Sequence, residues 1–528
     1  MLKKLVIFVH KWLGVVLALF FLMWFVSGVV LYFVPFPSLT AAERLAALPA
    51  LTLEGPGCCL AAQDAAQRAG LRPAVGGEAR LGMLGDAPVW RLLATEDAVP
   101  ARAVARAPQP DARPRWRTVD ARSGTLLAPL SPDAAARVAE AFSGRRATGT
   151  EWVERDQWTV PQGLDVHRPL IKVLLDGDDG LQLYVSPGAA EVVRDTRRAE
   201  RFWNWVGAVP HWIYPTVLRQ FPRAWHHVVV WLSIPGVLLA ATGIVLGVWQ
   251  LFLNRQRWIP YRRFWMRWHH ILGLVAAVFT LTWMFSGLMS MNPFGVFGGA
   301  AVGPQARAQW AGEPAPLSRG PRDAVVLAAA QGMVVQELDL LRIAGQAWYR
   351  VRGWESAGIP SQWLVRADGP SATMARALPD AMLRARLQML RPEAPAPAVE
   401  KMEHYDDLYY ARRQDGAALH TRPLPVWRAR WADDGVAVYA DPASGRIVLR
   451  TDAGTAWQRV LYHGLHSLDF APLLARPVLR TWLIVGLSLL GVALCATSCV
   501  IAWRVLVPRR RAARAQGPAR DAGGAWTA

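Results

Sequence analysis

Four stretches of the chain contain no Asp, Glu, Lys or Arg: residues 12–34, 228–253, 271–291 and 482–503. Each is long enough to cross a bilayer as a helix, which takes about 20 apolar residues. The pattern predicts four transmembrane helices joined by two large polar segments. It excludes a soluble cytoplasmic enzyme and also a protein embedded wholly in the membrane. The expected divisions are spans at 1–34, 226–253, 268–291 and 482–506, large segments at 35–225 and 292–481, a link at 254–267 and a tail at 507–528.

The first stretch is predicted to be a membrane helix that is not cleaved. Its apolar run exceeds the 7–15 residues of a secretory signal, and no small-residue cleavage site follows it before Pro35 and Pro37.

The basic residues that flank the spans are grouped on one side. Lys3 and Lys4 precede the first span, and further groups fill the link (Arg255, Arg257, Arg262, Arg263, Arg267) and follow the last span (Arg504, Arg509, Arg510, Arg511, Arg514). Because positive loops stay in the cytoplasm, both termini and the link are expected there, with both large segments in the periplasm of a bacterial inner-membrane protein. The net charge of +19 therefore indicates contact with anionic lipid headgroups of the bilayer and no nucleic acid.

The two halves of the chain resemble each other. H-K-W-L-G at 10–14, with Trp24, Ser27 and Gly28, recurs 259 positions later as H-H-I-L-G at 269–273, with Trp283, Ser286 and Gly287. An offset of 255 relates D-D-G at 178–180 to 433–435, and likewise His211 to His466, Gly236 to Gly491, and Thr242 to Thr497. The constant offsets predict a tandem repeat of helix, outer domain and helix, with parallel halves.

The outer segments are predicted to be mixed α/β domains. Strands are expected at 89–93, 116–120, 348–351 and 436–439, a turn at 121–124, helices at 132–142 and 323–331, and a loop at 392–399. No nucleophile elbow, zinc-protease, P-loop or dinucleotide motif is present. Cys58–Cys59 and the pair Cys495 and Cys499 have no metal-binding spacing, and a vicinal disulfide at Cys58–Cys59 is left open.

Eight of the eleven histidines lie near span ends. His10, His269 and His270 are expected on the cytoplasmic side, and His211, His226, His227, His463 and His466 on the outer side. His167, His404 and His420 belong to the outer domains. Ionisable residues at membrane depth are costly, so they suggest function.

His10 with Gly14 and His269 with Gly273 suggest haem ligation. Two imidazoles from facing helices hold a haem iron, and a small residue lets the flat macrocycle approach the backbone. The aromatic rings of Trp12, Trp24, Trp265, Trp268 and Trp283 could line such a site. Only one of His269 and His270 can ligate one iron, and the repeat favours His269.

A second haem is expected at the outer side, with His466 among its ligands. Zinc or copper binding and purely structural hydrogen bonding are the alternatives for both sets of histidines. Two sites at opposite faces of the membrane imply stepwise electron transfer. Arg168, Arg219, Arg223, Arg422 and Arg480, near the membrane ends of the outer domains, suit either anionic ligands or lipid headgroups.

The clustered motifs resemble those of the PepSY-associated transmembrane family. They include W-F-V-S-G at 24–28, R-W-H-H-I-L-G-L at 267–274, Y-D-D-L-Y-Y at 405–410 and Y-H-G-L-H-S-L-D-F at 462–470. The resemblance implies PepSY-like outer domains. It also implies similarity to inner-membrane haem-containing ferrisiderophore reductases, with matching histidines at His10, His269, His270, His463 and His466.

The leading hypothesis is therefore a membrane oxidoreductase with one or two haem b groups. It would pass electrons from an unidentified cytoplasmic or membrane donor to a periplasmic ferric siderophore. The alternatives are a non-enzymatic module whose PepSY-like domains bind or inhibit a periplasmic partner protein, and a carrier of haem or metal.

Overall fold

The computed structural model describes all residues except 56–57, 75–77, 97–112, 254–258, 298–301, 314, 356–357, 372, 413–421 and 508–528. His420, part of the basic link and nearly all of the basic tail therefore lie outside the described residues. The chain forms two compact units. Unit 1 comprises Met1–Val26, Leu232–Met284 and Gly486–Ala528, and unit 2 comprises Ser27–Trp231 and Phe285–Val485.

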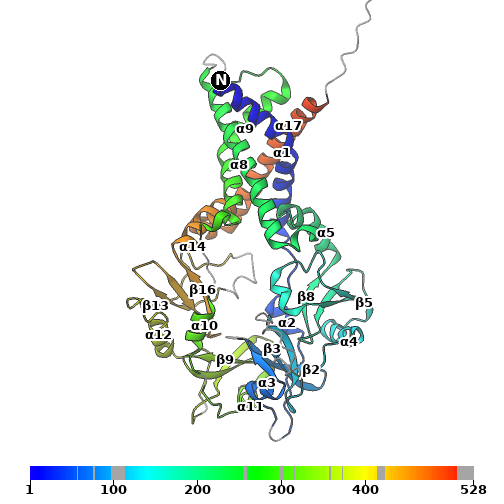
Figure 1. Cartoon of the computed structure of the whole chain (residues 1–528), viewed down its shortest axis with the longest axis vertical. Helices are drawn as coiled ribbons and strands as arrows, with labels where there is room; N and C mark the ends of the chain where they lie inside the picture. The colour runs from blue at the N-terminus through cyan, green and yellow to red at the C-terminus, as the bar shows by residue number, and fades with distance from the viewer. Residues whose placement is uncertain are drawn as a thin grey trace, which may run out of the picture. The chain divides into compact units, whose positions relative to one another are not determined.

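Four long apolar helices confirm a multi-pass membrane protein (Figure 1). They are α1 (Leu2–Phe33), α8 (Pro222–Leu253), α9 (Phe264–Ser290) and α17 (Pro477–Leu506). The last three begin about one turn before the predicted spans, since a helix continues through a charged residue that ends an apolar window. Pro222 and Pro477 stand at the first helical position, where the missing N–H of proline costs nothing.

Unit 1 is held together by apolar side chains of these helices. Leu17, Phe21, Phe25, Leu239 and Cys495 form its buried core. Two glycines allow close packing there: a Cβ added at Gly236 would lie 2.5 Å from Met284, and one added at Gly491 would lie 2.4 Å from Phe25. Cys495 and Cys499 of α17 carry free thiols.

Unit 2 contains an eight-stranded antiparallel sheet to which both halves of the chain contribute. Its order is β1-β3-β2-β9-β10-β11-β12, and β4 also pairs with β3. At the middle of the sheet β2 pairs with β9, and Arg80 lies opposite Asp339, 259 positions later. The strands are β1 (Leu71–Pro73), β2 (Ala79–Leu84), β3 (Ala87–Glu96), β4 (Arg115–Asp120), β9 (Met333–Ile343), β10 (Gln346–Glu355), β11 (Pro360–Arg366) and β12 (Met374–Ala375).

Two four-stranded antiparallel sheets complete the strands of unit 2, each in sequential order. The first comprises β5 (Ala147–Val153), β6 (Leu170–Leu175), β7 (Gln182–Ser186) and β8 (Glu191–Thr196). The second comprises β13 (Ala398–Met402), β14 (Val426–Arg430), β15 (Ala437–Ala440) and β16 (Ile447–Thr451). β7 and β15 begin 255 positions apart, the offset that the D-D-G motifs show.

The predicted strands lie within or overlap β3, β4, β10 and β15, and the expected loop at 392–399 overlaps the start of β13. The helix expected at 132–142 is α4 (Pro132–Ser143). Ser131 accepts a hydrogen bond from the backbone of Ala134, and Gly144 ends the helix at φ 69°, a conformation that glycine adopts readily.

The other short helices connect or cover the sheets. They are α2 (Ala41–Ala46), α3 (Ala62–Arg68), η1 (Gln162–His167), α5 (Arg198–Val206), α6 (Ala208–His211), α7 (Thr216–Arg219), η2 (Pro293–Gly295), α10 (Pro304–Ala311), α11 (Pro321–Ala329), α12 (Asp380–Gln388), α14 (Ala453–Gln458), the π-helix η3 (Arg459–Gly464), α15 (Leu465–Ser467) and α16 (Ala471–Leu474).

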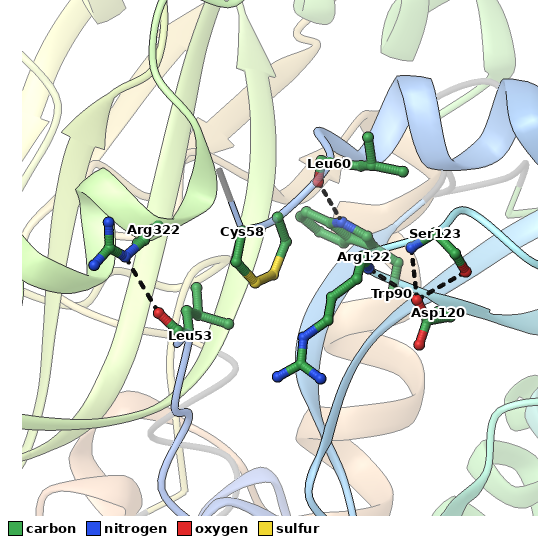
Figure 2. Close-up of a disulfide and its surroundings, with 9 residues drawn as sticks. Leu53, Cys58, Leu60, Trp90, Asp120, Arg122, Ser123 and Arg322 are labelled. Atoms are coloured by element: carbon green, nitrogen blue, oxygen red, sulfur yellow. Dashed lines mark hydrogen bonds between the residues drawn. A yellow bond between two sulfur atoms is a disulfide. The ribbon is translucent and has the colours of Figure 1, made fainter. Parts of the chain in front are cut away.

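Cys58 and Cys59 form a vicinal disulfide in unit 2 (Figure 2). The segment around it joins both halves of the chain. Before the disulfide, the carbonyl of Leu53 accepts a hydrogen bond from Arg322 at 3.3 Å, and after it, the carbonyl of Leu60 accepts one from the indole of Trp90 at 2.9 Å. Because the bond joins neighbours, it closes no long loop and contributes little through chain entropy.

A buried ionic network joins the halves within unit 2. Arg44 donates two hydrogen bonds to Glu337, at 2.9 and 2.7 Å, and Arg80 pairs with Glu191 at 2.5 Å. Burial alone would raise the pKa of the Glu337 carboxyl, but the guanidinium groups of Arg352 and Arg44 hold that pKa well below its usual range. Removing one member would leave a buried charge uncompensated, so the network acts as a unit.

Candidate functional site: two histidine pairs

The first pair is His10 on α1 and His269 on α9, both in unit 1. Their ring centres lie 6.4 Å apart, with an angle of 46° between the ring planes. The Nδ1 of His10 lies 3.2 Å from the carbonyl oxygen of Leu239 and 3.3 Å from the hydroxyl of Thr242. On the other side, the Nδ1 of His269 lies 3.2 Å from the hydroxyl of Thr497 and 3.3 Å from that of Ser498.

These contacts fix the protonation of both rings. A carbonyl oxygen only accepts a hydrogen bond, so the Nδ1 of His10 carries the proton. The hydroxyl of Thr497 donates to the carbonyl of Leu494 at 2.6 Å, and that of Ser498 donates to the same oxygen at 3.0 Å. Both hydroxyl oxygens therefore accept from the Nδ1 of His269. In each ring Nε2 keeps the lone pair that a metal ion requires.

The second pair is His211 on α6 and His466 on α15, both in unit 2. Their ring centres lie 6.1 Å apart, with an angle of 56° between the ring planes. The Nδ1 of His211 lies 3.2 Å from the hydroxyl of Ser27, and the Nδ1 of His466 lies 3.1 Å from that of Ser286. Both pairs thus share one plan, in which two facing imidazoles each contact, at Nδ1, a hydroxyl from another element.

The spacing of the rings suits two axial ligands of one iron. An imidazole nitrogen binds a metal at about 2.0 Å and its ring centre lies about 1.1 Å further back, so two opposed ligands place their ring centres about 6.3 Å apart. The described part of the chain contains no group of three or more His, Cys, Asp or Glu side chains arranged to hold a metal ion. Two nitrogens alone do not complete the coordination of a metal ion, whereas a porphyrin supplies four more. The residues therefore fit haem better than zinc or copper.

Glycines pack against these imidazoles. A Cβ added at Gly243 would lie 2.9 Å from Cε1 of His10, and one added at Gly28 would lie 3.1 Å from Cε1 of His211. The sequence suggested Gly14 and Gly273 for a close approach. In the structure, added Cβ atoms there would lie 3.8 and 3.9 Å from leucines on neighbouring helices, which is ordinary contact. The glycine that touches His10 is therefore Gly243.

The surroundings of His466 are rich in charge. Asp469 is fully buried and accepts hydrogen bonds from Arg480 at 2.8 Å, from Arg412 at 2.7 Å and from the hydroxyl of Tyr410 at 3.1 Å. Burial, and then the nearby Asp469 carboxylate, raises the pKa of the Tyr410 hydroxyl above its usual value.

Comparison with known proteins agrees with the membrane architecture. Residues 8–367 match the family described as the PepSY-associated TM region. The chain belongs to this family. The matched range includes His10, His211 and His269 and ends before His466. No curated protein matches the chain.

Within this PepSY-associated chain, four other predicted histidines lie outside the two ring pairs. His270 is buried, with its ring 5.4 Å from that of Tyr261. The Nε2 of His226 lies 2.9 Å from the carbonyl oxygen of Met291, and the ring of His227 lies edge-on to His226 at 5.5 Å. His463 lies in η3 beside Tyr462 at 4.7 Å. Burial, and then the positive charge of Arg412, lowers the pKa of His463 to about 4.

Sequence reasoning missed the hydroxyl residues that contact the histidines. Their signal was present, because Ser27 and Ser286 share the offset of 259, and Thr242 and Thr497 share the offset of 255. Serines and threonines that recur at the two offsets could therefore have been recognised from the sequence as residues that contact the histidines.

Proposed function

We propose that this protein is a bacterial inner-membrane haem protein that carries electrons across the bilayer to a periplasmic ferric siderophore. The supporting observation is the repeated plan of the two histidine pairs, with ring centres 6.4 and 6.1 Å apart and a hydroxyl at every Nδ1. A haem b with two imidazole ligands supplies reversible one-electron transfer and keeps no open position for other chemistry.

The residues have distinct roles in this proposal. His10 and His269 hold one haem, and His211 and His466 hold the second. The hydroxyls of Thr242, Thr497, Ser27 and Ser286 fix the ring orientation and present Nε2 to the iron. We infer that the halves arose by duplication, since each ligand and each of these hydroxyls has a matched partner at one of the two offsets.

The topology follows from charge and from the disulfide. The basic residues beside the spans favour a cytoplasmic position for both termini and the link. Disulfides persist in oxidising compartments such as the periplasm, and Cys58–Cys59 lies in the first large segment. Reporter fusions test this arrangement. Fusions after residues 150 and 400 should be active only in the periplasm, and one after residue 260 only in the cytoplasm.

The acceptor is inferred from the chemistry of iron. Hard oxygen ligands of a siderophore prefer Fe(III), so delivery of one electron yields Fe(II) and weakens the complex. Arginines are suited to anionic chelators because their planar groups bind carboxylates. The chain has no dinucleotide motif, so the electron must come from a cytoplasmic or membrane donor.

The first experiment measures the visible spectrum of protein expressed with haem supplied. The wild type should show a low-spin Soret band. His10→Ala and His211→Ala should each remove about half of it, because one of two sites loses an axial ligand. The matched control is His404→Ala, because His404 is exposed and lies outside both pairs. Wild-type protein without haem would contradict the proposal and favour the module that binds a periplasmic partner protein.

The second experiment tests the acceptor. Protein reduced with dithionite and freed of excess reductant is mixed with a ferric siderophore and a ferrous chelator. One Fe(II) complex should form for each haem that is reoxidised, because each transfer moves one electron. Reduced protein that persists with several ferric chelators would refute the reductase role and leave haem binding untouched.

A further inference from the structure

Arg219, the last residue of α7, is a buried cation without an anionic partner among the described residues. Its side chain is 7% exposed, and its Nε and Nη1 atoms are buried with no hydrogen-bond partner among the described residues. No carboxylate of the described chain lies within ion-pair distance of it. A buried guanidinium is strongly destabilising unless an oxygen acceptor compensates it, so this position calls for one.

Aromatic rings hold Arg219 in place. Its guanidinium carbon lies 5.0 Å from the ring centre of Tyr214 and 4.6 Å from that of Trp225. The two rings pack edge to face at 5.6 Å, and the indole of Trp225 donates a hydrogen bond to the carbonyl of Trp212 at 3.0 Å. Ring faces attract a cation but do not accept the in-plane N–H groups as an oxygen does.

The other half of the chain shows what is missing. At the offset of 255, Tyr214 corresponds to Asp469 and Trp225 corresponds to Arg480. Those two residues form an ion pair at 2.8 Å. The second half therefore pairs its buried Arg480 with a carboxylate. The first half has a tyrosine and a tryptophan at those two positions and carries its buried arginine at Arg219, which matches Leu474.

We propose that Arg219, framed by Tyr214 and Trp225, is a binding site for an oxyanion, a carboxylate or phosphate group of a bound ligand. Its fork of N–H groups matches both. Two sources offer this chemistry. One is the propionate of a haem held by His211. The backbone N–H of Tyr214, three residues after His211, bonds to the carbonyl of Val209, so Tyr214 lies in the same turn of the chain as His211. This source rests on the proposed function.

The second source is the phosphate of a membrane phospholipid, which does not depend on haem. α7 directly precedes the membrane helix α8, and Val217 and Phe221 beside Arg219 are 76% and 59% exposed. Exposed apolar side chains next to a span are typical of residues at the interface between lipid headgroups and acyl chains.

The test uses the full chain in a maltoside detergent, which contains no phosphate, and has two arms. The first compares binding of haem and of haem dimethyl ester, whose carboxylates are blocked. The second uses native mass spectrometry to compare binding of phosphatidylglycerol and of diacylglycerol. Each arm compares wild type with Arg219→Gln, with Arg219→Lys for partial rescue, and with exposed Arg137→Gln, on α4, as matched control.

In one arm, wild type should bind the ligand that carries the oxyanion (haem or phosphatidylglycerol) about tenfold more tightly than Arg219→Gln does, as expected for a charged hydrogen bond. Wild type and Arg219→Gln should bind the ligand without the oxyanion (haem dimethyl ester or diacylglycerol) equally. Arg137→Gln should match wild type. Equal binding by wild type and a folded Arg219→Gln in both arms would overturn the proposal. If Arg219→Gln does not fold, Arg219→Lys decides, since a lysine lacks the fork and should lose part of the preference. A protein that binds no haem refutes the proposed function, and the lipid arm then decides Arg219 alone.

Discussion

His211 and His466 face each other with the same immediate contacts, yet their wider surroundings differ. Each Nδ1 contacts a serine hydroxyl, at 3.2 and 3.1 Å, and a glycine backs each ring. Three residues after His466 in the chain, Asp469 forms the centre of a network of ion pairs, whereas three residues after His211 stands Tyr214, whose ring packs against that of Trp225.

The difference separates two kinds of role. What both halves keep, the imidazole and its hydroxyl, is what any axial ligand needs. The residues that only one half has, such as Asp469 or Arg219, are specific to the surroundings of one histidine. The second half has a compensated pair of charges, Asp469 and Arg480, and the first half has Arg219, which lacks an anionic partner among the described residues. Altering matched residues can therefore show which surroundings matter for folding and which for ligand binding.

The largest effect is expected for Asp469→Asn. The change leaves the buried guanidinium of Arg480 and the partly exposed guanidinium of Arg412 without their carboxylate, which typically costs about 3–5 kcal/mol. The matched change in the first half, Tyr214→Phe, removes only a hydroxyl and should cost about 1 kcal/mol or less. Thermal unfolding in detergent measures both. Equal losses of stability in the two variants would mean that Asp469 and Tyr214 contribute to folding in the same way.

The next effect concerns pH and lies in the first half. Burial lowers the pKa of His167, which stacks on Trp116, to about 4, against 6.5 for an ordinary histidine. Between these values the unfolded chain binds more protons than the folded one, so the stability from neutral His167 is complete above pH 6.5 and is lost as pH falls towards 4. The loss reaches roughly 3 kcal/mol.

His167→Phe should remove this part of the pH dependence while keeping a ring against Trp116. Melting temperatures of wild type and variant are compared at pH 7.5 and 4.5, and wild type should lose more. The same decrease in both proteins would show that His167 does not titrate in this range.

A smaller effect is expected from the serine hydroxyls. Ser27→Ala and Ser286→Ala each remove the contact at one Nδ1, and loss of such an orienting partner should weaken haem binding by about tenfold. Haem binding should weaken by a similar factor in both variants, because both halves have the contact between a serine hydroxyl and Nδ1. Haem titration of each variant measures it. A large difference between them would indicate that only one imidazole depends on its hydroxyl.

The smallest effect is expected at the matched glycines. A Cβ at Gly28 would lie 3.1 Å from His211, and one at Gly287 would lie 3.6 Å from His466. Gly28→Ala must therefore displace its imidazole by a few tenths of an ångström, about the tolerance of a well-packed site, and Gly287→Ala need not. Gly28→Ala alone should broaden the Soret band. Equal spectra would show that His211 adjusts freely.

The sequence by itself determined the four membrane helices and the matched positions of the two halves. Membrane crossing depends on the length and composition of one continuous stretch, so it can be predicted locally. The two offsets can likewise be found without a three-dimensional structure, and they already matched His10 with His269 and His211 with His466. The same reasoning did not assign Ser27, Ser286, Thr242 or Thr497 a role, because a hydroxyl has no chemistry of its own to mark it.

Only the tertiary structure decided which side chains meet. His10 contacts Thr242 across 232 positions, and His211 contacts Ser27 across 184. It also placed His269 opposite His10, with His270 beside Tyr261, although the two histidines are neighbours in sequence. Five arginines near the spans looked alike in sequence. In the structure Arg480 contacts a carboxylate, whereas Arg219 contacts two aromatic rings. Which partner a side chain meets depends on distances in space, and these cannot be read from distances along the chain.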